Sequence, residues 1–210
     1  GFKKTEAGGK NFGIISPKQI ISKSSQIGIA KIAIAMHQDK IIENLYNFGI
    51  GENLDINWLG FLSGNLINKD KLYDIDKASI GYGYLMHTNL LQIARAYSVF
   101  ANNGFRVEPK IIYGSETVLK KVISADVANY VLEALRETIT DGTALNLKDS
   151  PIEIAGKTGT TEKYIVGEGY VSGKYISSFA SIFPYDDPEF IVIVSICLLY
   201  TSDAADDLYR

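Results

Sequence analysis

The amino-acid sequence predicts an α+β fold, in which helices come first and an antiparallel group of strands follows. Up to about residue 142 the apolar residues recur at helical spacing between capping signals. After Ser150 they form the short alternating or continuous runs that are typical of strands. Between the last two runs lies PYDDP, whose turn chemistry suits a hairpin and therefore antiparallel pairing.

The first part of the helical region combines a clear start with an apolar continuation. Ser16 and Pro17 predict an N-cap followed by a first helical residue. The stretch Ile27–Met36 is apolar on nearly every face, with Lys31 as its only charge, and this pattern predicts a buried helix. Residues 44–74 contain four glycines and are expected to be mostly irregular connection.

Two further helices have amphipathic patterns and recognisable ends. Residues 88–101 run to a glycine cap at Gly104, and residues 124–141 begin at the cap Ser124 and stop at Gly142. The first helix places at helical spacing Leu91, Ala94, Tyr97 or Ser98, and Ala101. The apolar stripe of the second consists of Val127, Tyr130, Val131, Leu135 and Ile139. The strands that follow are expected at residues 152–154, 177–183 and 190–197.

Composition and charge exclude several functions. The chain has 210 residues and a formal net charge of −3, so it lacks the basic face that nucleic acid or an anionic membrane requires. Its single cysteine, Cys197, rules out an internal disulfide. The chain opens without methionine or an apolar leader, and its longest apolar run, residues 190–200, is too short to span a bilayer. We expect either a cytosolic protein or an internal piece of a longer one, and favour the second.

The clearest candidate site is Lys157-Thr158-Gly159-Thr160, within IEIAGKTGTTEKY. An enzyme that attacks an amide through an acyl intermediate needs a nucleophile, a base and donors for the oxyanion. The lysine offers positive charge and the threonine hydroxyls can bind a carboxylate, while the glycine lets a ligand lie close to the strand. By itself this motif is weak, because a solvated strand end has the same composition.

Other stretches make the signal more specific. The segment from GKTGTT through GEGYVSGKYISSFASIFP resembles the penicillin-binding transpeptidases, whose third motif, KTG, lies on an edge strand followed by a loop and another strand. The family's GYG…LQ helix has a counterpart in SIGYGYLMHTNLLQIARAYSVFANNG. The segment that leads into KTG in the family resembles ISADVANYVLEALRETITDGTA. ISKSSQIGIAKIA resembles the junction that carries the second motif, S-x-N. The resemblance extends from about Ser16 to Ile196 and is greatest to class B, division-type (septal) enzymes. It implies a penicillin-binding/β-lactamase-like transpeptidase fold, with a helical subdomain and an antiparallel sheet flanked by helices.

The resemblance also implies a role for each motif residue. Lys157 would hold the hydroxyl of Ser24 and supply positive potential, and Ser24 would pass a proton towards the leaving amine. Thr158 and Thr160 would bind the carboxylate of a D-Ala-D-Ala stem peptide or of a β-lactam. The backbone N–H of Thr160 would form one half of the oxyanion hole, and Gly159 belongs to the implied substrate-binding set.

The second motif departs from the family at Gln26, an implied substrate-binding residue, because the pattern there has asparagine. Glutamine keeps the amide donor and acceptor but reaches about 1.5 Å further. A misplacement of roughly 1 Å can lower a rate on the order of a hundredfold. A structural alternative for Ser24-Ser25-Gln26 is that either serine is the N-cap of the helix that follows. A second apparent S-x-N, at residues 63–65, falls in an irregular family connection and is interpreted as a decoy.

The family nucleophile, the serine of an S-x-x-K motif, has no counterpart in the chain. We therefore expect residues 1–196 to be a transpeptidase domain that is incomplete at both ends, with a helical part at about 16–142 and a sheet part at about 150–196. Residues 197–210 match nothing expected of the family and are interpreted as a truncation or read artefact, or else as a divergent C-terminus. The KTG strand should lie at one edge of the sheet. The edge beyond residues 190–196 should be unpaired, which predicts poor solubility of the isolated chain.

Three functional hypotheses follow. The first is a peptidoglycan D,D-transpeptidase at the extracytoplasmic face of the membrane, without a cofactor, of which this chain alone is inactive. Its partners would be a stem peptide or lipid-linked precursor, β-lactams and, through the parent protein, a glycosyltransferase and division proteins. The second is a serine β-lactamase or β-lactam sensor, against which the GYG…LQ helix and the long GEGYVSGKY loop argue. The third is a catalytically silent scaffold or relic, which Gln26 favours. His37 and His87 have no partners at ligand spacing, so no metal site is expected.

Overall fold

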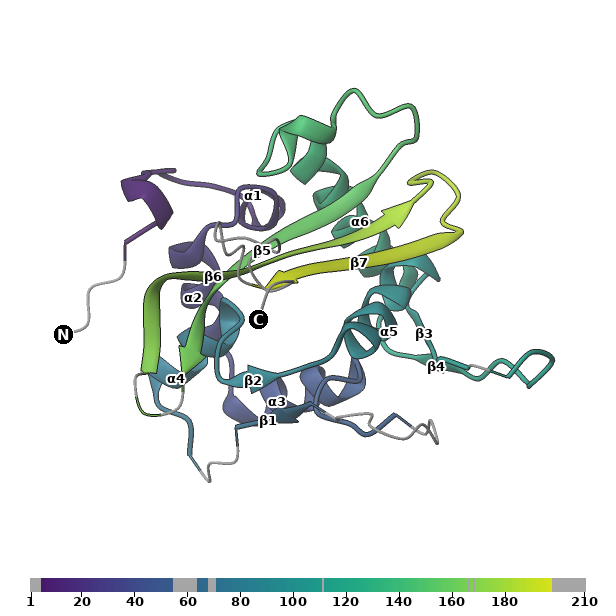
Figure 1. Ribbon diagram of the computed structural model, residues 1–210, viewed down its shortest axis with the longest axis horizontal. Coiled ribbons are helices and arrows are strands. Elements are labelled where there is room, and N and C mark those ends of the chain that lie inside the picture. The colour runs from purple at the N-terminus through teal and green to yellow at the C-terminus, as the bar shows by residue number, and fades with distance from the viewer. Residues whose placement is uncertain are drawn as a thin grey trace, which may run out of the picture.

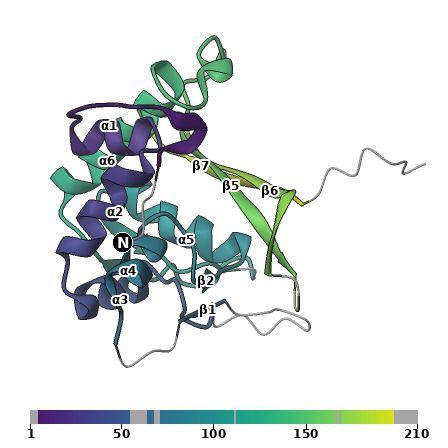
Figure 2. The ribbon, with the colours of Figure 1, turned by 90° about the vertical axis from the view of Figure 1, so that its left-hand side faces the viewer.

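A computed structural model describes residues 5–54, 64–67, 71–110, 112–165, 167 and 169–197. Figures 1 and 2 show a twisted sheet on one side of the molecule and a layer of helices on the other. The helices are η1 (Ala7–Gly9), α1 (Pro17–Ser22), α2 (Gln26–Ala35), α3 (Gln38–Asn47), α4 (Asp74–Gly81), α5 (Leu90–Ala101), α6 (Ala125–Thr140) and η2 (Leu145–Leu147). The strands are β1 (Asn65–Leu66), β2 (Met86–His87), β3 (Phe105–Val107), β4 (Leu119–Lys121), β5 (Ala155–Ile165), β6 (Gly169–Phe183) and β7 (Phe190–Cys197). This arrangement confirms the predicted α+β class.

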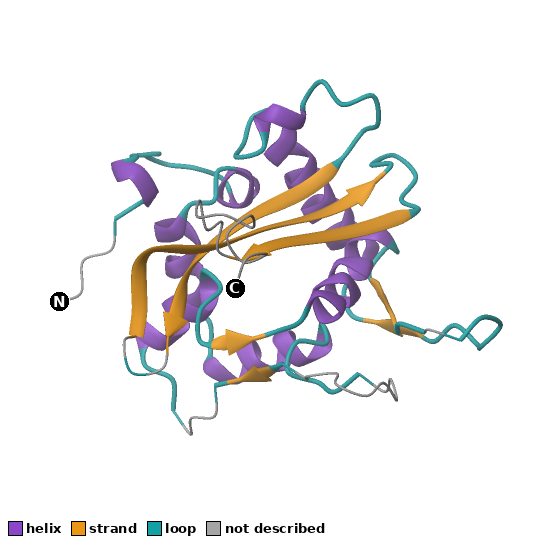
Figure 3. Ribbon diagram, in the orientation of Figure 1, coloured by secondary structure: helices purple, strands orange, loops and turns teal. Residues whose placement is uncertain are grey.

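The main sheet is antiparallel, with the strand order β5-β6-β7 (Figure 3). The strand that carries the KTGT sequence is therefore at an edge of the described sheet, as predicted. Two details of the prediction are wrong. The strand begins at Ala155, because residues 151–152 form a bend. The stretch expected to be a loop after KTGT instead extends β5 and β6 into a long hairpin, in which Ile165 pairs with Gly169.

The hydrophobic core between the layers joins α6 to the sheet. Leu132 and Leu135 of α6 form a buried cluster with Ala155 of β5 and Ile182 of β6. The predicted stripe of α6 is correct at Leu135 and Ile139 and wrong at two other positions. Val127 and Tyr130 are exposed, because the row of buried residues on α6 runs to one side of the predicted stripe and shares only Leu135 and Ile139 with it. That row consists of Ala128, Leu132, Ala134, Leu135, Thr138 and Ile139.

The apolar helix α2 is less buried than its sequence predicts. Ala30 and Ala33 face the interior, where α2 packs against α4. Ile32 and Ile34 remain 39% and 38% exposed, so one side of the helix is open in the described structure. The expectation of irregular connection over residues 44–74 is also wrong at its start, because α3 continues to Asn47.

A buried cluster of charged side chains connects α5 to the loop after α3 through ion pairs and hydrogen bonds. Arg95 is only 3% exposed, and its Nη1 lies 3.0 Å from Glu108 Oε2. Its Nη2 donates a hydrogen bond to the carbonyl oxygen of Gly49. Arg106 completes the cluster, with its Nη1 2.9 Å from Glu52 Oε2 and its Nη2 2.6 Å from Glu108 Oε1. These contacts make the interior face of α5 polar, which the sequence pattern did not reveal.

The outer strand β7 presents exposed apolar side chains along an edge to which no other described strand is paired. The exposed residues alternate along the strand and comprise Phe190, Val192, Val194 and Ile196. We predict that Val194→Lys will raise the soluble fraction of the 210-residue chain when it is expressed alone, because a charge on an edge strand opposes edge-to-edge pairing. The matched control is Ile32→Lys, which removes an apolar side chain of similar exposure, 39% against 47% for Val194, from a helix. Equal gains from both variants in a sedimentation assay would show that the strand edge is not the cause.

Candidate active site

The loop between α1 and α2 places Ser24 in an unusual backbone conformation. The Ser24 N–H bonds to Ile21 O at 3.2 Å and the Ser25 N–H bonds to Ile20 O at 3.0 Å, the two bonds of a Schellman motif. Ser24 occupies the left-handed position of this motif, with φ of 54°. A glycine is usual there, and an L-residue costs about 1–2 kcal/mol. Strained residues of this kind cluster at functional sites, which makes Ser24 a candidate on structural grounds.

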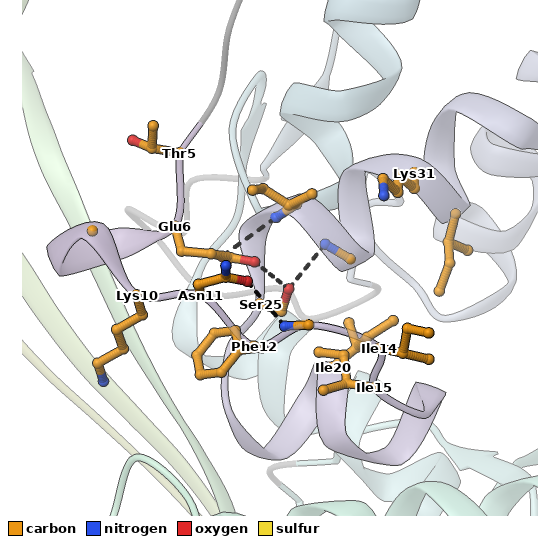
Figure 4. A pocket seen from close by; sticks show the side chains of 15 residues that line it. Thr5, Glu6, Lys10, Asn11, Phe12, Ile14, Ile15, Ile20, Ser25 and Lys31 are labelled. Carbon is orange, nitrogen blue, oxygen red and sulfur yellow. Dashed lines mark hydrogen bonds between the residues drawn. The ribbon is translucent and has the colours of Figure 1, made fainter.

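The neighbouring Ser25 has a structural role. Its Oγ accepts a hydrogen bond from the Gly28 N–H at 2.9 Å, so Ser25 is the N-cap of α2. The same hydroxyl donates to Glu6 Oε1 at 2.6 Å, and Glu6 Oε2 accepts the Gln26 N–H at 2.8 Å. Figure 4 shows this arrangement in a pocket of about 730 Å³ between the N-terminal segment and α2. Of the two serines that could cap this helix, Ser25 is the one that does so. Ser24 does not cap α2 and remains a candidate site residue.

Lys157 of β5 reaches across to this loop. Its Nζ donates hydrogen bonds to Ser24 Oγ, 133 residues away in the chain, and to Thr158 O at 2.9 Å. Burial lowers the pKa of Lys157 to about 8 from its usual value of 10.5, because the charged ammonium is partly removed from water. The fold therefore brings together two of the predicted site residues, Ser24 and Lys157.

The other predicted residues of β5 lie beside Lys157 along the strand edge. Thr158 is half-buried, and Thr160 is exposed. Gly159 is paired with Ser178, and a Cβ at Gly159 would lie only 2.6 Å from Ser178 Oγ. A side chain at this position would therefore require the Ser178 hydroxyl to rotate away, because the next nearest Ser178 atoms lie 3.9 Å off. Gln26 is half-buried at the first position of α2, where the structure gives its backbone N–H to Glu6.

The turn after α6 joins both halves of the site, and sequence reasoning missed it. Thr143 Oγ1 lies 2.7 Å from Thr158 Oγ1, and the Thr143 N–H donates to Ser22 O at 3.3 Å. Ser22 is fully buried, and its Oγ donates to Glu137 Oε1 at 2.9 Å. The sequence identified Gly142 only as a helix stop. The signal that could have found this turn is the small, polar Gly142-Thr143 pair, which lies between the end of α6 and the strand with the candidate motif.

We predict that Gly142→Ala will destabilise the chain and displace the Ser24 loop. A Cβ at Gly142 would collide with the carbonyl oxygen of Ser22 and with the backbone of Thr138. Both obstacles are backbone atoms, so the turn must move, at a cost of about 1–3 kcal/mol. Urea unfolding measures the loss. The control is Gly114→Ala, which removes a glycine without a collision, because no atom lies within 4 Å of a Cβ there. Its cost comes instead from the backbone, which has φ of 80°.

The histidines take no part in this site. His37 is at the N-cap position of α3, where its Nδ1 lies 3.3 Å from Asp39 Oδ2, and His87 is on β2. Among the described residues, no three His, Cys, Asp or Glu side chains are grouped as a metal site would require. None of the described helices has the length and apolar composition needed to cross a bilayer. Residues 198–210 and Ser63 of the apparent second S-x-N lie outside the described residues.

Comparison with known proteins identifies the fold and the family. The model of the penicillin-binding protein transpeptidase domain matches residues 2–200. The chain therefore belongs to the penicillin-binding protein transpeptidase family, which confirms the resemblance seen in its motifs. The peptidoglycan D,D-transpeptidase FtsI of Buchnera aphidicola subsp. Schizaphis graminum is 31% identical over 181 residues, which cover 84% of this chain and 31% of that protein. The chain spans about a third of the length of the curated relatives it matches, 33% and 31% for two of them.

Solved structures agree with this assignment. The transpeptidase domain of Burkholderia pseudomallei penicillin-binding protein 3 superposes with a TM-score of 0.83 at 29% identity, over 92% of this chain and 59% of that one. Penicillin-binding protein 3 of Mycobacterium tuberculosis, solved in complex with aztreonam, gives a TM-score of 0.77 at 25% identity, over 87% of this chain and 45% of that one. The helical layer and the antiparallel sheet are thus those of a penicillin-binding transpeptidase domain.

Proposed function

We propose that this chain supplies two of the three motifs of a peptidoglycan D,D-transpeptidase, a serine acyltransferase that β-lactams acylate. The reaction would break the C–N bond between the last two residues of a D-Ala-D-Ala stem peptide and transfer the acyl group through a serine ester to an acceptor amine. The observation that carries the proposal is the hydrogen bond from Lys157 to Ser24, which joins the second and third motifs. Family membership supports it.

In this proposal each site residue has a distinct task. Ser24 passes a proton to the nitrogen of the leaving amine, and Lys157 holds the Ser24 hydroxyl and supplies positive potential. Thr158 and Thr160 bind the carboxylate of the stem peptide or β-lactam, because hydroxyls donate well to an ionised acceptor. The Thr160 N–H stabilises the oxyanion. The attacking serine is expected from an S-x-x-K motif encoded upstream.

Gln26 completes the proposed substrate-binding set, with Gly159 keeping the strand open to a ligand. The side-chain amide of Gln26 belongs to the residue that starts α2, two positions after Ser24. It would contact the peptide part of the substrate with one donor and one acceptor, as an asparagine would. The protein would act at the extracytoplasmic face of the membrane, on a stem peptide or lipid-linked precursor, together with a glycosyltransferase and division proteins.

The first experiment is to sequence the gene beyond both ends of this chain and to label the complete gene product with a fluorescent penicillin. An upstream S-x-x-K and a covalent adduct that withstands denaturation are expected. The matched control is the serine-to-alanine variant of that motif, which should not be labelled. A gene without S-x-x-K whose product is not labelled would overturn the proposal in favour of a silent scaffold or relic.

A further inference from the structure

The hydroxyl groups of Thr143 and Thr158 are in direct contact, although Thr143 belongs to no motif of the site. Their oxygens are 2.7 Å apart, and in the free protein either hydroxyl can be the donor. Thr143 is on the exposed turn between α6 and η2, and Thr158 is on β5. This is a contact between side chains of two separate elements, at the position proposed to bind a carboxylate.

A bound carboxylate would fix the direction of this hydrogen bond. An ionised carboxylate has acceptor oxygens only, and a threonine hydroxyl has one hydrogen to donate. If Thr158 gives its hydrogen to the ligand, only its lone pairs remain available to Thr143. Thr143 must then be the donor, and a hydroxyl that accepts a hydrogen bond becomes a stronger donor to its own acceptor.

The backbone around Thr143 holds its side chain in place for this role. The Thr143 N–H bonds to Ser22 O, and the Ala144 N–H bonds to Thr138 O at 3.0 Å. Ala144 is buried beneath the turn. Lys23 Nζ lies 3.3 Å from Asp141 Oδ2, which adds a contact between the same turn and the residue before Ser24. The turn is therefore anchored to the Ser24 loop while its hydroxyl reaches the KTGT strand.

We propose that Thr143 is a positioning residue, which donates a hydrogen bond to Thr158 and thereby orients the Thr158 hydroxyl towards the carboxylate of the ligand. This inference rests on the proposed function and deepens it, because it assigns recognition of the ligand's carboxylate to a pair of hydroxyls. It predicts that Thr143 matters for ligands with a free carboxylate and is indifferent to neutral ones.

The test compares benzylpenicillin with its methyl ester on the complete gene product. Thr143→Val should lower the second-order rate constant of acylation by benzylpenicillin about three- to tenfold, the range for loss of one neutral hydrogen bond. The rate constant for the methyl ester should not change. Thr143→Ser, which keeps the hydroxyl, should restore the rate constant for benzylpenicillin. Thr140→Val removes an exposed threonine hydroxyl three residues earlier and should leave both rate constants unchanged.

A double-mutant cycle shows whether Thr143 acts through Thr158. In a Thr158→Val background the added Thr143→Val should have no further effect on acylation by benzylpenicillin. Equal slowing of both ligands by Thr143→Val, additive effects in the cycle, or an unchanged rate constant for benzylpenicillin would each overturn the inference while the proposed function stands. A wild-type product that benzylpenicillin does not acylate would instead overturn the proposed function, and the inference with it.

Discussion

Replacing Lys157 with methionine should lower the rate of acylation by benzylpenicillin on the order of a hundred- to ten-thousandfold in the complete gene product. The expected loss is large because Lys157 Nζ is the partner that the structure gives to Ser24 Oγ. Methionine keeps an unbranched side chain of similar length, so the main change is the loss of charge and of the hydrogen-bond donor. The measurement is the rate of covalent adduct formation at saturating fluorescent penicillin.

The matched control for this variant is Lys163→Met, six residues further along the same strand. That substitution removes an equal charge from β5 and should change the acylation rate less than twofold. Six residues along a strand span roughly 20 Å, which exceeds the Debye length of about 8 Å at physiological salt. A Lys157→Met protein that is acylated at the wild-type rate would show that Lys157 does not assist the proton transfer, and would refute its assigned role.

The lowered pKa of Lys157 has a consequence for stability, with a definite sign. Between pH of about 8 and 10.5 the unfolded chain holds this proton while the folded chain has lost it. The free energy of unfolding therefore rises with pH in this window and, as far as Lys157 is concerned, is flat below it. The total gain is on the order of 3 kcal/mol. Urea unfolding at the two ends of the window should show this rise in wild type and a smaller one in Lys157→Met; parallel curves would contradict it.

Replacing Arg95 with methionine should lower the free energy of unfolding by about 3–5 kcal/mol, the usual cost of breaking a buried ion pair from one side. Arg95 is 3% exposed, and its guanidinium donates hydrogen bonds to Glu108 Oε2 and to the Gly49 carbonyl oxygen. The substitution removes both donors. The Gly49 carbonyl would stay buried without that donor, and Glu108, which is 30% exposed, would keep only its contact with Arg106. An acceptor left buried without its donor costs more than the hydrogen bond itself contributes. Urea unfolding, or the loss of a cooperative transition, measures the effect.

Arg136→Met is the matched control for the buried cluster. Arg136 Nη2 lies 3.2 Å from Glu153 Oε1, and the side chain of Glu153 is more than half exposed. Arg136 itself is 21% exposed and also donates to Ile154 O at 3.1 Å, so the control removes a partly exposed ion pair and one further hydrogen bond. Surface pairs contribute about 0–1 kcal/mol, so this variant should be less destabilised than Arg95→Met. Comparable losses in the two variants would show that burial does not set the cost.

The sequence predicted the fold class and the strand of the site because both depend on local patterns. Periodicity separates helices from strands, and the KTGT sequence with its flanking segments identified the family. The burial of Arg95 could not be predicted, because its partners Glu108 and the Gly49 carbonyl come from other parts of the chain. The exposure of Ile32 and Ile34 was missed for a related reason: an all-apolar helix is consistent with burial, but the sequence does not say what covers it.

The division of roles between Ser24 and Ser25 likewise needed three dimensions. Both serines have the composition of a helix cap, and their order in the sequence is equally compatible with either role. The positive φ of Ser24 and the hydrogen bond from Gly28 to Ser25 distinguish them. Thr143 was overlooked because its contact with Thr158 joins two separate elements, 15 residues apart in the chain, and no local pattern encodes that pairing.

The carboxylate of Glu6 also determines where an anionic ligand can find compensation for its charge. The first N–H groups of a helix carry the positive end of its dipole and attract anions. At α2 those donors, the Gln26 and Ile27 N–H groups, already face Glu6 Oε2 at 2.8 and 3.4 Å. A negative ligand approaching Ser24 would meet a helix end that is already neutralised. Under the proposed function, the charge of such a ligand would therefore be balanced from β5, by Lys157 and the threonine hydroxyls, and the α2 side would be left to contact the uncharged part of the ligand.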